Sequence, residues 1–281
     1  MRSIKHLLAA AGLATLTACG GGGGGSHTAT GTTPAPGATD QSMGGIWTSQ
    51  YTVTSGVNSG DVIQAEGIVS ETGQYFAYSK NTTNGCAGLE FGQLSVSGAN
   101  VTGTGSSGIV RYSTSQGVTT TCVYPDGSTS ATGTLAGQVT ARANLMITAT
   151  GTTSLGGPLN ETTNFTFSSL YLNPSSLAAI AGNYNDGGLT MTVDANGAVF
   201  EQNPNGCVIT GQVSIINAAY NAYGVSVSFS SCSGTSAGLN GVAASGLITL
   251  DASTSPATVI GGVTANIGGQ TFVEVFDLAR M

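Results

Sequence analysis

The sequence is poor in charge, and this shortage excludes several classes of protein. Only 7% of the 281 residues are Asp, Glu, Lys or Arg, against about a quarter in an ordinary soluble domain. Disordered chains combine low hydrophobicity with high net charge, whereas 40% of this chain is hydrophobic. The 44 glycines outnumber all charged residues together and lack the three-residue period of collagen. The chain is therefore expected to fold, with its glycines in turns between short strands.

Basic side chains and histidines are scarce. Six basic residues accompany 13 acidic ones, and such a surface repels nucleic acid, which binds clusters of Lys and Arg. Only His6 and His27 occur, so a Ser-His-Asp triad, a Cys-His pair and a His-ligated metal site are not expected. Gly-x-x-x-x-Gly-Lys, the phosphate-binding loop, is absent as well. We expect no cofactor, no metal and no nucleic-acid partner.

A hydrolase with paired carboxylates is the one enzymatic alternative left open. Its acid and base would be drawn from Asp61, Glu66, Glu71, Glu90, Asp126, Glu161, Asp186, Asp194, Glu201, Asp251, Glu274 and Asp277. No signature marks any pair of these, and several stand beside Gly in turn sequences, where Asp is favoured for backbone reasons. We therefore predict no catalytic residues and no enzymatic activity.

The N-terminus has a short apolar run, well below the roughly 20 residues that span a bilayer. Arg2 and Lys5 precede the stretch LLAAAGLAT (7–15), a pattern typical of a secretory signal. The next four residues, LTAC (16–19), resemble the lipobox of bacterial lipoproteins. The resemblance implies a signal peptide at 1–18 and a lipidated N-terminal Cys19. Because Gly20 follows instead of Asp, it also implies the outer membrane, on its periplasmic or outer side.

Cleavage would leave four basic and thirteen acidic residues, a net charge of −9. Anionic headgroups would repel this chain, so membrane attachment would rest on the lipid of Cys19. Residues 19–43 are rich in Gly, Thr and Pro and have no apolar periodicity. We expect them to form a disordered tether with a root-mean-square span of about 25–30 Å.

The body of the chain repeats one pattern. VSETGQYF (69–76) aligns with VDANGAVF (193–200), and Asn-Gly-Cys follows each, at 84–86 and 205–207. GIW (45–47) aligns with GNY (182–184), and GQLSV (92–96) aligns with GQVSI (211–215). Landmarks in one order predict an internal duplication. The duplication divides the body into domain 1 at 44–173, a linker at 174–180 and domain 2 at 181–281.

Period-two patterns dominate both copies. In VSVSF (225–229) and LTMTV (189–193), apolar residues alternate with Ser or Thr, as in strands with one packed face. Asp126-Gly127 and Asn196-Gly197 indicate tight turns, and one helical turn is expected near Pro174. The expected fold class is all-β, with two tandem antiparallel β-barrel or β-sandwich domains. In architecture alone they resemble lipocalin-like barrels, small lysozyme-inhibitor barrels and tandem-barrel envelope lipoproteins.

Four cysteines remain besides Cys19, and four allow three disulfide connectivities. The duplication selects Cys86–Cys122 and Cys207–Cys232, which keep each bridge within its own copy. An oxidising compartment outside the cytoplasm would support both bridges.

Aromatic residues supply the candidate contact site. Tyr75, Phe76 and Tyr78 cannot all lie on one face of a strand, so one face must expose an aromatic ring or give it to a partner. We expect a partner or ligand contact at Tyr75, Tyr78 and Tyr112, with Arg111 as a neighbouring cation.

The sequence thus favours a non-enzymatic, outer-membrane-anchored interaction or structural module of the bacterial envelope. A small-ligand-binding or enzyme-inhibitor barrel is the alternative, and a carboxylate hydrolase is a third hypothesis. An internal cavity would favour the ligand barrel, whereas two carboxylates about 5–10 Å apart in a cleft would favour the hydrolase.

Overall fold

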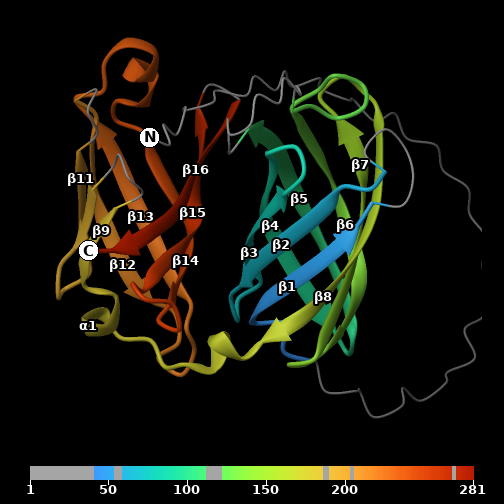
Figure 1. The fold of residues 1–281 in the computed structure, drawn as a ribbon, viewed down its shortest axis with the longest axis horizontal. Coiled ribbons are helices and arrows are strands. Elements are labelled where there is room, and N and C mark those ends of the chain that lie inside the picture. The colour runs from blue at the N-terminus through green and yellow to red at the C-terminus, as the bar shows by residue number, and fades with distance from the viewer. Residues whose placement is uncertain (1–40, 54–58, 112–121, 186–189, 203–205, 268–269) are drawn as a thin grey trace, which may run out of the picture.

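The computed structural model describes residues 41–53, 59–111, 122–185, 190–202, 206–267 and 270–281. They form two closed antiparallel barrels of eight strands each, side by side (Figure 1). The predicted all-β class with two tandem domains is confirmed, and the domains are barrels and not sandwiches. The predicted signal peptide, Cys19 and nearly all of the expected tether lie outside the described residues.

Barrel 1 is an up-and-down meander that closes when β1 pairs with β8. Its strands are β1 (Gly45–Thr52), β2 (Val62–Val69), β3 (Gln74–Asn81), β4 (Cys86–Ser97), β5 (Asn100–Arg111), β6 (Ser130–Thr140), β7 (Asn144–Thr153) and β8 (Pro158–Ser168). Ordered contacts begin before Gly44, inside the stretch assigned to the tether. The amide of Gln41 donates to the carbonyl of Gly98 at 2.8 Å, and Met43 is buried in the barrel.

Barrel 2 has the same topology, with β9 in the position of β1 between β10 and β16. Its strands are β9 (Gly182–Asn185), β10 (Thr190–Val193), β11 (Ala198–Gln202), β12 (Val208–Ile215), β13 (Tyr223–Ser230), β14 (Ala243–Asp251), β15 (Thr258–Ile267) and β16 (Gln270–Arg280). A 3₁₀ turn, η3 (Gly234–Leu239), precedes β14.

The segment between the barrels contains two short helical turns, η2 (Ser169–Leu172) and α1 (Leu177–Ile180). The side chain of Ser176 caps α1 by accepting a hydrogen bond from the amide of Ala179 at 3.1 Å. The helical turn expected in this linker is therefore present.

The two copies agree in atomic detail as well as in strand order. Gly73 and Gly197, at matching turns, both have φ of 84°, a conformation that favours glycine. Gln93 and Gln212 each donate from Nε2 to the carbonyl of the residue before that glycine, at 2.6 and 2.7 Å. These matched contacts support the duplication inferred from the sequence.

The interiors of the two barrels differ. Among the described residues, the core of barrel 2 contains 22 buried members, from Ile180 to Leu278, whereas that of barrel 1 contains nine, centred on Trp47, Leu94 and Leu145. Barrel 2 is therefore packed more fully along its length than barrel 1.

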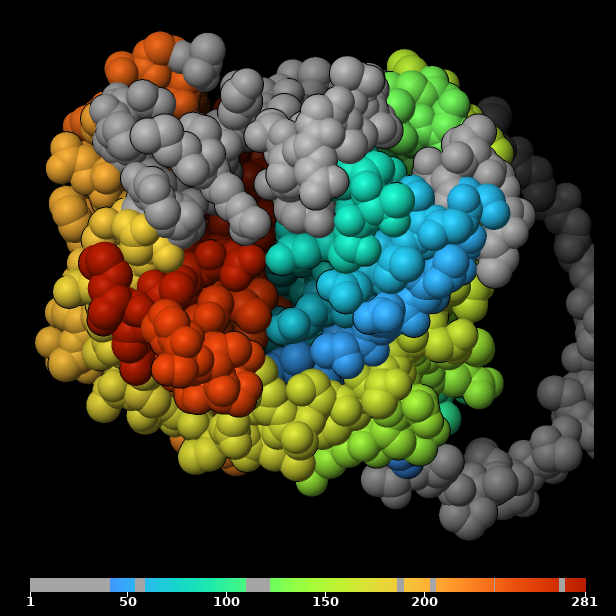
Figure 2. Space-filling model, viewed as in Figure 1, coloured from blue at the N-terminus to red at the C-terminus, as the bar shows by residue number. Residues whose placement is uncertain are grey.

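The barrels meet through an apolar interface of their own. From barrel 1 it contains Ile46, Ile68, Phe76 and Leu89, which pack with Tyr171, Ala222 and Leu247. The ring of Phe76 lies against Gly262 of β15, where a Cβ atom would collide with it. In the space-filling view the surface of barrel 2 (red) lies directly against β2 and β3 (blue to cyan) (Figure 2). The side chain of Phe76, which points out of barrel 1, is thus covered by barrel 2.

Candidate functional site: the lumen of barrel 1

Strand alternation sets which side chains enter barrel 1. Trp47 of β1 and Leu94 of β4 lie in its core. Because every second residue of a strand faces the same way, Tyr51 on β1 and Glu90 on β4 also point inward. Glu161 on β8 is inward for the same reason, since it lies four residues from Phe165, which packs on that core.

These inward residues surround a cavity of about 280 Å³ at one end of the barrel. Polar side chains in its wall include Tyr51, Asn81, Asn84, Glu90, Tyr124, Glu161 and Thr163, and apolar ones include Ile63, Ile109, Val123, Ile147 and Phe165. A further space of about 40 Å³ adjoins it beside Tyr75, Glu90 and Glu161. The volume is near the lower limit for small-molecule sites.

A row of four glycines crosses the barrel beside the smaller space, which Gly105 and Gly133 border. Gly92, Gly105, Gly133 and Gly151 are direct partners across β4, β5, β6 and β7. Tyr75 pairs with the first of them, and its hydroxyl lies where a side chain at Gly105 would be. The ring of Tyr75 therefore lies across the glycines, between the packed core and the cavity.

Hydrogen bonds hold two groups of the cavity wall in place. The hydroxyl of Tyr51 donates to Oε1 of Glu161 at 2.9 Å, and the hydroxyls of Ser107 and Tyr124 are 2.7 Å apart. No described residue donates a hydrogen bond to the carboxylate of Glu90. Its side chain points into the lumen, where it is exposed to the space of the cavity.

The electrostatic environment of the lumen is negative. Burial, followed by repulsion from Glu161, raises the pKa of Glu90 to about 7. Burial and the charge of Glu161 also raise the pKa of Tyr51, and burial raises that of Tyr124. Among the described residues that line the cavity, none is Lys, Arg or His. The space therefore has two carboxyl groups without a described countercharge.

The second barrel provides an internal comparison. Trp47 pairs with Phe167 and its counterpart Tyr184 pairs with Arg280. Six residues before these partners stand Glu161 and Glu274, so the two glutamates occupy equivalent positions. Glu274 is only 5% exposed. The glycine row is kept only in part: Gly211 corresponds to Gly92, but Val227 and Ala244 stand in the places of Gly105 and Gly133. Val199 stands in the place of Tyr75.

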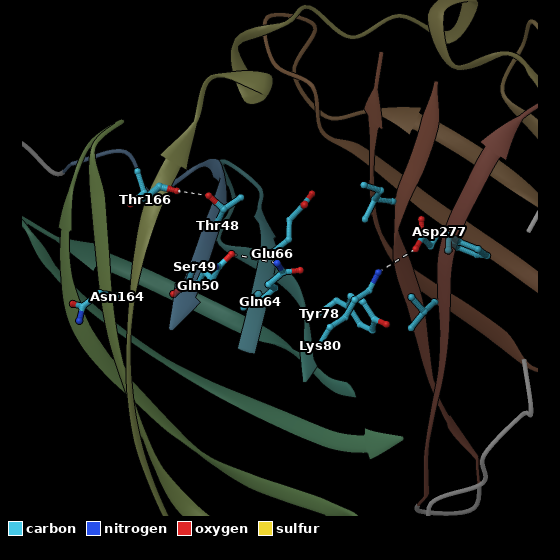
Figure 3. A pocket seen from close by; sticks show the side chains of 14 residues that line it. Thr48, Ser49, Gln50, Gln64, Glu66, Tyr78, Lys80, Asn164, Thr166 and Asp277 are labelled. Carbon is cyan, nitrogen blue, oxygen red and sulfur yellow. Dashed lines mark hydrogen bonds and ion pairs between the residues drawn. The ribbon is translucent and has the colours of Figure 1, made fainter. Parts of the chain in front are cut away.

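A second space lies between the barrels (Figure 3). This inter-barrel cleft has a volume of about 550 Å³ and is lined by β1, β2, β3 and β8 on one side and by β15 and β16 on the other. Lys80 of β3 pairs with Asp277 of β16 at 3.4 Å across it. Glu66 points into the cleft, with Oε1 buried and unpaired, and burial raises its pKa.

The aromatic contact residues predicted from the sequence separate into different environments. Tyr75 is a core residue of barrel 1, 7% exposed. Tyr78 faces the inter-barrel cleft, with the Lys80 Nζ atom 5.1 Å from its ring centroid. The backbone of Arg111 pairs with Cys86 at the end of β5, while its side chain and Tyr112 lie outside the described part. Tyr75 and Tyr78 thus differ in their main environments, although Tyr78 also borders the cavity of barrel 1 and Tyr75 borders the space beside it.

Both predicted cysteine pairs lie at disulfide distance. Cys86 and Cys122 have a Cα–Cα distance of 5.4 Å, and Cys207 and Cys232 one of 3.8 Å. Each bridge stays within its own barrel, as the duplication predicted. Cys86 also lines the lumen, so the first bridge joins the cavity wall to the segment that leads into Tyr124.

Sequence reasoning named Glu90 and Glu161 only among twelve carboxylates and did not single out Tyr51, Tyr124 or the glycine row. The sequence did contain a signal for these residues. In a strand of period two, a polar residue that lies two or four positions from a core residue faces the interior. The pairing of distant strands was needed to bring these residues together.

Within the described ranges, no group of three or more His, Cys, Asp or Glu residues is placed to hold a metal ion. No helix in that part of the chain has the length and apolar character needed to cross a membrane. No protein-family model matches the chain, and no curated protein or solved structure is significantly similar to it.

Proposed function

We propose that the chain is a lipid-anchored outer-membrane protein of the bacterial envelope that binds a small molecule in the lumen of barrel 1, without catalysing a reaction. The cavity of barrel 1, set against the larger buried core among the described residues of barrel 2, carries the binding part of this proposal. Eight-stranded barrels either fill their interior with side chains or hold one small ligand. We propose that barrel 1 belongs to the second kind.

The anchoring part of the proposal rests on the lipobox-like LTAC at 16–19. A Cys19→Ser variant is expected to leave the membrane pellet and appear in the soluble fraction. Persistence of that variant in the pellet would contradict a lipid anchor. Metabolic labelling with a palmitate analogue, lost in the same variant, would identify the modification directly.

Ligand binding is tested with a substitution that fills the lumen. Ala149 faces the cavity from β7, whereas its neighbour Thr150 is exposed on the outside. Small molecules that bind the body of the protein in a ligand-observed NMR screen should lose binding in Ala149→Trp and retain it in Thr150→Trp. Equal binding to both variants would place the ligand elsewhere and overturn the proposal.

A carboxylate hydrolase is the second candidate, and one observation favours it. Glu90, with its pKa raised to about 7, shares the lumen with Glu161, as an acid and a base do in glycoside hydrolases. Turnover of a bound ligand, lost in Glu90→Gln while binding persists, would favour this candidate. Binding of an unchanged ligand favours the non-enzymatic protein.

A further inference from the structure

We propose that the lumen of barrel 1 selects a small organic cation, in which an ammonium group is carried on an apolar body. The inference rests on the proposed function, because it names the chemical class of the ligand for the same cavity. Three independent properties of the wall lead to it: carboxyl groups without a described basic neighbour, aromatic rings and aliphatic side chains within one small space.

The carboxyl groups define the charge of the ligand. Glu90 and Glu161 border the cavity, and among its described lining residues there is no basic side chain. Glu90 has no described hydrogen-bond donor, and its side chain is exposed to the space of the cavity. A carboxylate in such a position is stabilised by a donor or by an opposite charge, which a bound ammonium group supplies. An anionic ligand would be repelled by both carboxylates.

The rest of the wall defines the body of the ligand. Tyr51, Tyr124 and Phe165 place aromatic rings along the cavity, and the faces of aromatic rings attract cations, quaternary ammonium groups above all. Ile63, Ile109 and Ile147 add aliphatic surface. A bare Ca²⁺ or Mg²⁺ ion would instead require a shell of about six or more oxygen ligands. The mixed wall therefore fits an alkylammonium better than a metal ion.

The second barrel shows what the same fold does without such a space. Glu274, the counterpart of Glu161, is buried beside the large core of barrel 2. Barrel 2 also has Val227 and Ala244 in the places of Gly105 and Gly133, which border the smaller space of barrel 1. A cation should therefore bind once per chain, in barrel 1.

The test uses choline and n-butylammonium as probes, together with 3,3-dimethylbutan-1-ol and butan-1-ol as their uncharged counterparts. At pH 8, isothermal titration with the folded body of the chain should detect both cations at one site. Each alcohol should bind about tenfold more weakly or not at all, since it lacks the charge that the carboxylates recognise. Butanoate should not bind.

Glutamine variants locate the site. Glu90→Gln and Glu161→Gln should each weaken choline binding by about tenfold. Glu66→Gln, which neutralises a partly buried carboxylate in the inter-barrel cleft, should leave it unchanged. Far-ultraviolet circular dichroism and thermal melting establish that each variant is folded, so that a loss of binding is attributed to the missing charge.

The outcomes separate this inference from the proposed function. Equal affinity for choline and its uncharged counterpart, or failure of both cations to bind at 10 mM, overturns the cation proposal. The lumen as a ligand site is then judged by the Ala149→Trp and Thr150→Trp pair alone. If choline binds but Glu66→Gln weakens it as much as Glu90→Gln does, the cation is held by the cleft or by overall charge, and the proposal is also overturned.

Discussion

Trp47 and Tyr184 make the same hydrogen bond at equivalent places in the two barrels. The indole Nε1 of Trp47 donates to the carbonyl of Met43 at 3.0 Å, and the hydroxyl of Tyr184 donates to the carbonyl of Ile180 at 2.6 Å. Both rings are fully buried, and each partner lies four residues earlier, where the chain enters the barrel. The duplication thus preserved a contact although the side chain changed.

This contact predicts that its removal lowers the unfolding free energy in both copies. The hydroxyl of Tyr184 also accepts a hydrogen bond from Arg280 at 2.8 Å, which its substitution removes as well. Trp47→Phe and Tyr184→Phe each leave a buried carbonyl without its donor, which costs about 1–3 kcal/mol of unfolding free energy. Urea denaturation followed by circular dichroism measures the change. Losses below about 0.5 kcal/mol in both variants would show that the contact does not stabilise the barrels.

The matched pair Phe76 and Phe200 tests the inter-barrel interface. Phe76 on β3 is 3% exposed against barrel 2, whereas Phe200 on β11 is 50% exposed. Phe76→Ala should cost about 3–5 kcal/mol, and Phe200→Ala about 1 kcal/mol or less. Small-angle scattering should show separated barrels in the first variant only. Similar losses in both variants would argue against a stabilising interface at Phe76.

The disulfides should contribute similarly to the two barrels. They close loops with sequence separations of 36 and 25 residues, for which the chain-entropy relation gives about 3.8 and 3.5 kcal/mol. The double variants Cys86→Ser/Cys122→Ser and Cys207→Ser/Cys232→Ser should lower the unfolding free energy by these amounts. Peptide mapping without reduction provides the control, and a bridge between the two copies would contradict the pairing.

Glu90 should make stability depend on pH. Its pKa is raised to about 7 in the folded protein, so the unfolded chain ionises first as the pH rises above the ordinary value of about 4.5. Stability is therefore fully present below pH 4.5 and falls until about pH 7. Because water in the lumen screens the charge, we expect a fall of about 1–2 kcal/mol.

The measurement compares thermal unfolding of the parent with Glu90→Gln at several pH values between 4.5 and 8. The difference between the two proteins should grow in favour of the variant up to about pH 7 and then remain constant. Parallel curves would mean that Glu90 titrates normally. The groups that face it are Glu161 on β8, Tyr51 on β1, Tyr75 on β3 and Tyr124 before β6, and all three tyrosines have raised pKa values.

Local patterns predicted the strands and turns because alternation and turn glycines act over a few residues. The repeat then predicted the cysteine pairs, since matched positions fold alike. The candidate site depends on longer relationships. Glu90 and Glu161 share a lumen only because β1 closes on β8, and no local signal records that closure. The sequence predicted that Tyr75 and Phe76 face opposite sides of their strand. Only the packing of the two barrels shows that Phe76 is the one that contacts barrel 2.

The four-glycine row also limits how the protein can change. A side chain at Gly92, Gly133 or Gly151 would meet a backbone carbonyl of the next strand, so enlarging these residues disturbs the wall itself as well as the space beside it. Single substitutions at these three glycines are therefore expected to destabilise barrel 1 as well as to narrow the space. Under the proposed function, the size of an accepted ligand would depend on residues that the fold needs, whereas the charge of the site, set by Glu90 and Glu161, could change without altering the wall.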